Sequence, residues 1–300
     1  MATKEWCLLN GLYVRKNEVY ECDVATLKQY REDYYRITLH RQIRRTGYEA
    51  VDGEPERGRK NTAGNERKLS ESLSRTRAAI FELALCNPWE WFVTLTLNPE
   101  YHDRKDLKTY KKKLSAFLKN YNRLHHTTIK YLLIPELHHD KIHWHMHGLM
   151  MGLPEERLKA FSEKEKLPIQ ILIELKKGNQ IYRWPAYEKA FGYITISKIR
   201  SAEGVSKYIT KYITKDLNET RIDLNDHLYY CSHGLQRAKK LYQGPLTKEI
   251  EEDYSNEYVK IKTVRTLEEA LTYFTDAEES VKLTVRAPQK IPRVPRRAHR

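Results

Sequence analysis

The stretch KIHWHMHGLM, from Lys141 to Met150, places histidines at alternate positions: His143, His145 and His147. Alternation is the period of a β-strand, so the three imidazoles are expected on one face of a strand. Trp, Met and Leu stand between and after them, which is typical of a strand in a protein core. Imidazole nitrogens on such a strand need a bonding partner, and a metal ion is one candidate.

The residues before this stretch predict a hairpin. IKYLLIPE, residues 129–136, is interpreted as a strand whose regular pairing should end at Pro135. The short connection LHHDK leads directly into the histidine strand, so antiparallel pairing of the two is the simplest connection. Further strands are expected in 92–97 and 191–200 and a strand-like segment in 168–175. Helices are expected over 69–85, 104–124, 155–167, 202–217, 248–253 and 267–278.

Composition narrows the class of protein. The 300-residue chain has a formal net charge of +14, which favours a polyanionic partner such as nucleic acid over a merely solvated basic surface. Cys7, Cys22, Cys86 and Cys231 form no CxxC pair. A disulfide framework or cysteine zinc site is therefore not indicated, and a reducing cytoplasm is expected. The sequence has no apolar run long enough to span a membrane and no GxxxxGK[ST] loop for a nucleotide cofactor.

The histidine strand and its neighbour form the predicted metal site. His145 and His147 should lie about 6.5 Å apart along a strand, so both imidazoles can converge on one cation. In the hairpin the best third ligand is Glu136, with His138 and then His143 as alternates. This donor set leaves positions for water and a substrate oxygen and predicts Mg²⁺ or Mn²⁺, with Mn²⁺ favoured. Ligating histidines are neutral, so binding should weaken below pH ~6.5.

Ordinary half-buried histidines on a sheet face would give the same HxH pair, and a structural zinc ion is a weaker alternative. The gathering of several histidines beside Glu136 favours a metal over simple packing.

The helix expected over 202–217 repeats a tyrosine–lysine pattern. Tyr208, Lys211, Tyr212 and Lys215 fall at i, i+3, i+4 and i+7, so they share one helix face. Burial of this stripe with the lysines extending to solvent is one interpretation. The other is covalent catalysis. A tyrosine hydroxyl, with a pKa of about 10, needs nearby positive charge to act as a nucleophile. The two lysines can supply that charge and hold a phosphate.

These motifs together resemble the HUH endonuclease superfamily. HMH at 145–147 matches its histidine pair, the doubled YxxK at 208–215 matches its tyrosine helix, and FVTLTLN at 92–98 is similar to its first motif. Their order resembles that of rolling-circle replication initiators, in particular replication proteins of phages and mobile elements with paired tyrosines. The resemblance covers roughly residues 90–216. His143 adds a histidine before the usual pair, so His143 and His145 form an alternative metal register.

The resemblance implies an α+β fold with a central antiparallel sheet of about five strands and flanking helices. It implies a metal-dependent, site-specific endonuclease and strand transferase that cuts one DNA strand. A 5′-phosphotyrosine link would form, and a free 3′-OH would prime rolling-circle replication. The expected partner is single-stranded or supercoiled origin DNA in the cytoplasm of a bacterial host. Because the sequence has no ATP loop, a separate host helicase and polymerase are expected.

Two other classes of protein remain open at this stage. A relaxase or single-strand transposase would use the same chemistry, whereas a non-enzymatic DNA-binding protein would use the histidines and tyrosines for packing and stacking.

Four regions are expected along the chain. The basic Pro-containing tail RAPQKIPRVPRRAHR should be extended and should add non-specific DNA affinity through Arg293, Arg296 and Arg297. The regions are an N-terminal extension of uncertain structure (1–75), the catalytic domain (76–220, possibly extending to about 245), a helical segment (246–285) and the tail (286–300).

Overall fold

The computed structural model divides the chain into two compact units, each treated by itself below. One is formed by residues 59–237, and the other by residues 1–58 together with 238–300. The described residues are 6–9, 12–15, 24–40, 66–138, 140, 142–216, 228–255 and 259–274. Side chains are described for 25–40, 74–138, 140, 142–210, 228–244, 246–255 and 259–274.

The unit of residues 59–237 is built on a seven-stranded antiparallel sheet in the order β11-β6-β7-β5-β10-β9-β8. The two edge strands are only two residues long. The strands are β5 (Trp91–Thr96), β6 (Lys130–Leu137), β7 (Trp144–Met151), β8 (Lys159–Ala160), β9 (Ile181–Arg183), β10 (Ile194–Lys198) and β11 (Tyr230–Cys231). The helices are α1 (Glu66–Cys86), α2 (Leu107–His125), α3 (Ile169–Lys176), α4 (Pro185–Ala190) and α5 (Ala202–Asp216), with a 3₁₀ turn at Glu155–Arg157.

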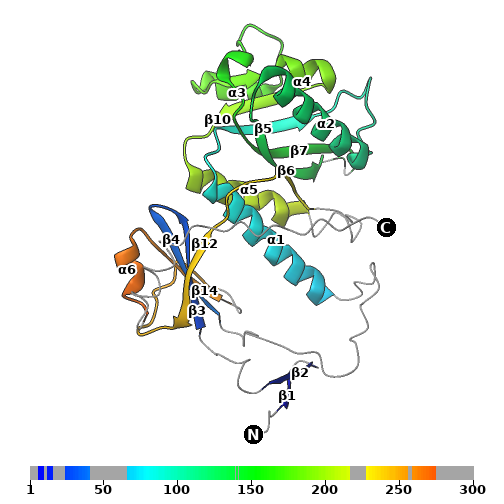
Figure 1. Cartoon of the computed structure of the whole chain (residues 1–300). Coiled ribbons are helices and arrows are strands. Elements are labelled where there is room, and N and C mark those ends of the chain that lie inside the picture. Colours follow the sequence, from blue (N-terminus) through cyan, green and yellow to red (C-terminus); the bar gives the residue numbers. More distant parts are fainter. Residues whose placement is uncertain are drawn as a thin grey trace. The chain divides into compact units, whose positions relative to one another are not determined.

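Side-chain alternation sends the apolar residues of these strands to two different cores. On one face Val93, Leu95 and Met146 pack against α2 and α4 through Leu114 and Tyr187. On the other face the apolar residues of the strands pack against α1 and α5. Figure 1 shows α1 and α5 together on that side of the sheet. The second core is formed by Ile80, Leu83, Ala84, Trp89, Leu132, Ile134, Leu149 and Ile209.

Gly148 is the point of closest approach between the histidine strand and its neighbour. A Cβ added there would lie 2.3 Å from the Leu132 carbonyl oxygen and 3.0 Å from Leu133 Cα. Both are backbone atoms of β6, so the Gly148→Ala variant must separate β6 from β7. We expect the free energy of unfolding to fall by about 1–3 kcal/mol, measured by urea denaturation.

Gly204→Ala is the control for this prediction, because a Cβ there meets only the Ser201 side chain, at 3.3 and 3.4 Å. Since it replaces a helical glycine, it should leave stability unchanged or raise it by up to ~1 kcal/mol. Equal stability of the two variants would contradict the close approach at Gly148.

The structure confirms the expected fold class and the β6–β7 hairpin, with corrections in the connecting regions. The pairing of β6 with β7 continues through Pro135, which lies opposite Met146, rather than ending there. Residues 168–175 were expected as a strand, but Ile169–Lys176 form helix α3, because Pro168, at φ −55°, suits the position just before a helix. The helix expected over 155–167 is absent, since Lys159–Ala160 pair with β9.

The second unit contains a five-stranded antiparallel sheet in the order β12-β3-β4-β14-β13. Its strands come from both ends of the chain. They are β3 (Val24–Arg31), β4 (Tyr34–His40), β12 (Lys239–Pro245), β13 (Tyr254–Ser255) and β14 (Val259–Val264), and one sheet face packs on α6 (Leu267–Leu271). A separate hairpin joins β1 (Trp6–Leu9) to β2 (Leu12–Arg15).

The helix expected over 248–253 does not form. The backbone of this segment lies beside β14 instead, because Asp253 N–H donates to the Ile261 carbonyl (2.8 Å). Its carboxylate also accepts a hydrogen bond from Thr263 N–H (2.6 Å). Of the helix expected over 267–278, the described residues show Leu267–Leu271 as helical.

Candidate active site

The sheet register aligns the predicted ligands across three strands. His145 in β7 lies directly opposite Glu136 in β6 and opposite Thr96 in β5. His147 lies two residues further along the same face, opposite Thr94 of β5. The site is therefore made by one hairpin and the strand that pairs with it.

Glu136, His145 and His147 converge on one point. Their ligand atoms lie within 4.8 Å of one another. Glu136 Oε2 lies 2.5 Å from His147 Nε2 and 3.4 Å from His145 Nε2. All three side chains are less than one fifth exposed. Among the residues that the structure describes, this is the group of acidic, histidine or cysteine side chains that can hold a metal ion.

The electrostatics of Glu136 favour its charged form. Burial raises the pKa of the carboxyl group, but hydrogen bonds from His145 and His147 outweigh burial and hold the pKa well below its ordinary value. A carboxylate is therefore ready at neutral pH to act as a ligand beside two imidazoles. This donor set fits Mg²⁺ or Mn²⁺.

The lowered pKa of Glu136 predicts a pH effect on stability without metal. A carboxyl group with a lowered pKa stabilises the fold above its unfolded-state pKa, and this contribution is lost as the pH falls through the folded-state pKa. In EDTA, the stability difference between the native chain and Glu136→Gln should therefore be largest near neutral pH. It should shrink as the pH falls below the ordinary glutamate value of 4.5.

Urea unfolding across this pH range tests the prediction. Glu100→Gln, which changes an exposed glutamate, is the control. A difference for Glu136→Gln that grows toward acid would contradict the assigned direction of the shift.

Thr94 is a functional residue that the motif analysis did not assign. Its hydroxyl oxygen lies 3.1 Å from Nδ1 of His147. A hydroxyl can donate or accept, so it can hold the ring whether Nδ1 carries the proton or not. When Nε2 of a histidine binds a metal, the proton resides on Nδ1 and needs such an acceptor. The alternation of Thr94 and Thr96 was visible in the sequence, but the pairing of β5 with β7 was not.

Thr94→Val is expected to weaken metal binding without removing a ligand. Loss of a group that orients a ligating histidine costs about 10–100-fold in metal affinity. Titration with Mn²⁺, followed by calorimetry, measures this directly. Thr195→Val is the matched control, because Thr195 lies opposite Thr94 in β10, one strand further from His147. An equal loss in both variants would contradict the orienting role of Thr94.

The two alternate ligands lie beside this cluster but outside it. Asp140 Oδ2 lies 2.7 Å from Nδ1 of His143 and 3.6 Å from Nδ1 of His138. The hydrogen bond from His143 holds the pKa of Asp140 well below its ordinary range. The His138 ring centroid lies 5.6 Å from that of His145. Asp140 therefore holds the alternates at the turn that precedes β7.

The tyrosine helix α5 lies on the same face as the ligands. The Ser201 hydroxyl accepts a hydrogen bond from Gly204 N–H (3.0 Å) at the start of the helix, and Ile209 is fully buried in the core that α5 shares with β6 and β7. Tyr208 is 49% exposed, and its ring packs edge-on against Phe92 at 5.5 Å. Phe92 in turn stacks with His147 at 6.3 Å. A single aromatic ring thus separates the Tyr208 side chain from a metal-ligand candidate.

Other predicted residues lie partly or wholly outside the described part of the chain. The backbone at Lys211, Tyr212 and Lys215 is helical, but their side chains are not among those described. Arg293, Arg296 and Arg297 lie outside the described residues altogether.

Tyr193 is a second residue that the sequence did not single out. It is 63% exposed. Its carbonyl accepts a hydrogen bond from Thr96 N–H (2.9 Å), so it continues the cross-strand row of Glu136, His145 and Thr96. An exposed aromatic ring in this row is suited to stacking against a nucleobase.

Comparison with known proteins points to replication. Residues 90–217 match the family model for Replication-associated protein ORF2. The matched segment runs from the residue before β5 to the residue after α5, so it contains the three clustered ligands and both tyrosines. The match supports a replication initiator protein, for which DNA is the partner. Searches of curated proteins and of solved structures found no match to the chain.

Membrane insertion was examined on the described helices. None of them combines the length and the apolar character that crossing a membrane demands.

Proposed function

We propose that the chain initiates rolling-circle replication as a metal-dependent, site-specific single-strand DNA endonuclease and strand transferase. The observation that carries this proposal is the convergence of Glu136, His145 and His147 beside the Phe92–Tyr208 contact. The sheet supplies the ligands and α5 supplies a hydroxyl, in the arrangement that the HUH resemblance leads us to expect. The family match over the same residues supports a replication role.

The cluster would hold a divalent ion, Mg²⁺ or Mn²⁺, which when bound polarises a phosphoryl oxygen. In the proposed reaction the phenol oxygen of Tyr208 or Tyr212 attacks the scissile phosphorus and loses its proton. A bond forms between the tyrosine oxygen and phosphorus while the bond from phosphorus to the 3′ oxygen breaks. That oxygen takes up a proton and becomes the 3′-OH primer. Lys211 and Lys215 would lower the cost of the phenolate.

Paired tyrosines suit a reaction with two strand transfers. Tyr212 lies one helical turn beyond Tyr208, about 6 Å along the axis. We propose that the tyrosines act in succession, and that a later attack by a free 3′-OH on the phosphotyrosine rejoins the DNA ends. A host helicase and polymerase would complete the cycle, in the cytoplasm of a bacterial host. The basic tail, with Arg293, Arg296 and Arg297, would add non-specific affinity.

The test is formation of a covalent adduct. The full chain is incubated with Mn²⁺ and labelled single-stranded oligonucleotides that tile the origin region of its own replicon. We expect a protein–DNA species that survives boiling in detergent and disappears in EDTA. Peptide mass mapping should find the phosphate on Tyr208 or Tyr212. A non-enzymatic DNA-binding protein would give no adduct with any oligonucleotide. A relaxase or transposase would give an adduct at a transfer or transposon end instead of a replication origin.

A further inference from the structure

The five-stranded sheet of the second unit carries a cross-strand row of positive charge. Lys240 of β12 lies directly opposite Lys28 of β3, and Lys28 lies directly opposite Arg36 of β4. Neighbouring strands are about 4.8 Å apart, so the three side chains start within about 10 Å of one another. We call these three residues the basic row.

The basic row lies on the sheet face opposite α6. Side chains alternate along a strand, and Leu27 and Ile37, which precede or follow the row residues, belong to the core beneath α6. Lys28 and Arg36 therefore point to the other side. Cations placed directly opposite each other lower the stability of a sheet. The row is thus an arrangement whose cost falls when a polyanion lies across it.

Aromatic rings flank the basic row and hold its guanidinium group. Arg36 lies over the ring of Tyr30, with its central carbon 5.6 Å from the centroid. Tyr30 meets Tyr34 edge-on at 5.8 Å, and Arg265 lies over Tyr34 at 5.4 Å. Alternating cations and aromatic rings are typical of surfaces that bind single-stranded nucleic acid, where the cations follow the backbone and the rings stack on bases.

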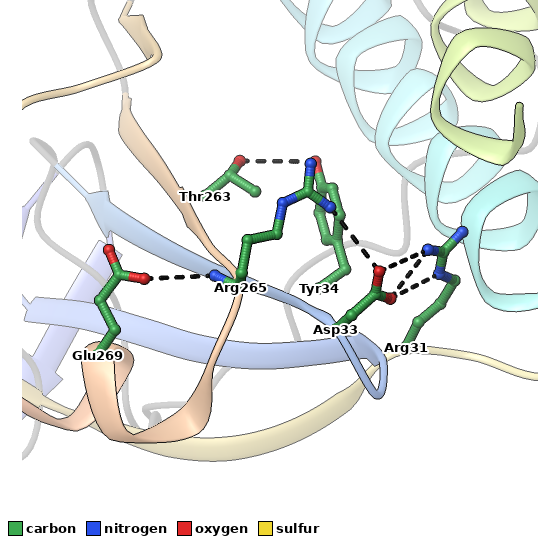
Figure 2. Close-up of polar contacts among 6 residues, drawn as sticks. All are labelled: Arg31, Asp33, Tyr34, Thr263, Arg265 and Glu269. Atoms are coloured by element: carbon green, nitrogen blue, oxygen red, sulfur yellow. Dashed lines mark hydrogen bonds and ion pairs between the residues drawn. The ribbon is translucent and has the colours of Figure 1, made fainter.

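The acidic charge of the adjacent hairpin is neutralised locally. Figure 2 shows Asp33 between Arg31 and Arg265. The carboxylate accepts hydrogen bonds from Arg31 at 2.9 and 3.0 Å and lies 4.0 Å from Arg265. The hydrogen bond from Arg31 lowers the pKa of Asp33, with a smaller opposing effect from burial. Asp33 is therefore engaged within the hairpin and does not offset the charge of the row.

We propose that the sheet face around the basic row binds the backbone of single-stranded DNA outside the cleavage site. Charge complementarity favours a polyanion, and the neighbouring tyrosines favour a strand with unpaired bases over a duplex. The identity of the polyanion as DNA rests on the function proposed above. This unit would hold the displaced or template strand while the HUH-like unit acts on the scissile phosphate.

Salt-dependent binding tests this proposal on the full chain. The probe is a fluorescent oligothymidylate, and binding is measured in EDTA so that cleavage plays no part. For Lys28→Gln, Arg36→Gln we expect the Kd to rise about 5–10-fold. The slope of log K against log salt should fall by about 1.4, the value for two lost contacts to a single strand. The variant Lys28→Arg, Arg36→Lys keeps both charges and should keep the native slope.

Lys260→Gln, Lys262→Gln is the matched control. It removes the same charge from β14 of the same sheet, at positions opposite Leu39 and Ile37 on the α6 side. These lysines lie 3.5 Å from Glu252 and 3.9 Å from Asp253. The control should bind oligothymidylate with the native Kd and slope, and thermal unfolding should show all variants folded.

Three results would overturn the basic row as a DNA-binding surface. They are a native slope in the row variant, equal losses in row and control variants, and a loss confined to duplex DNA. Adduct formation by the native chain with Mn²⁺ is scored separately. Absence of the adduct counts against the nuclease, whereas an unchanged salt slope counts against the row.

Discussion

The Tyr208→Phe, Tyr212→Phe double variant is expected to form no covalent adduct with DNA. Phenylalanine keeps the ring that packs on Phe92 but removes the oxygen that attacks phosphorus. Removing the nucleophile of an enzyme typically lowers the rate by on the order of 10³-fold or more. Fluorescence anisotropy should show native affinity for single-stranded DNA, because phosphate contacts from lysine and arginine remain. The measurement is the detergent-stable adduct on a labelled origin oligonucleotide.

The single variants decide which tyrosine acts first. We expect Tyr208→Phe to slow the first cleavage more than Tyr212→Phe, since the Tyr208 ring reaches His147 through Phe92. Tyr254→Phe is the control, with an exposed fraction of 54% against 49% for Tyr208, but in the other unit. A double variant that still forms the adduct would place the nucleophile elsewhere and remove the mechanistic role of α5.

The sequence was informative where the determining pattern is local. Alternation of His145 and His147, with a short connection back to Glu136, was enough to predict a hairpin that brings the three side chains together. The i, i+3, i+4, i+7 spacing was enough to predict the helix that carries Tyr208. In both cases the period of the backbone decides which side chains share a face, and neighbouring segments supply the partner.

Long-range pairing was not predictable by the same means. The hydrogen bond of Thr94 to His147 and the row position of Tyr193 depend on which strand lies beside β7, and no local pattern specifies this. Similarly, β3 and β4 pair with β12 and β14 from the other end of the chain. The basic row exists only in that pairing, since Lys28 and Lys240 are unremarkable in sequence. Residues 168–175 misled because β-branched residues favour strands, while Pro168 and the surrounding structure favoured a helix.

Replacing a clustered ligand is expected to have the second large effect. His145→Ala, His147→Ala and Glu136→Gln should each raise the Kd for Mn²⁺ by about 100-fold or more, since loss of even an outer group costs up to that much. Adduct formation should fall in parallel and recover in part with excess Mn²⁺. Glu136→Gln is the most specific variant, because it keeps the volume between the two imidazoles and removes only the charge. Mn²⁺ binding by calorimetry gives a readout that does not depend on cleavage.

His143→Ala distinguishes the two possible metal registers. The His143 ring is held by Asp140 at 2.7 Å, whereas His147 lies 2.5 Å from Glu136 and is oriented by Thr94. With the 145/147 register, His143→Ala should therefore bind Mn²⁺ within about threefold of the native affinity, as expected for a residue outside the ligand set. Native affinity in His147→Ala together with a large loss in His143→Ala would instead establish the 143/145 register. The ligands would then lie one residue pair closer to the turn, and the Phe92–Tyr208 contact would no longer connect the nucleophile to a ligating ring.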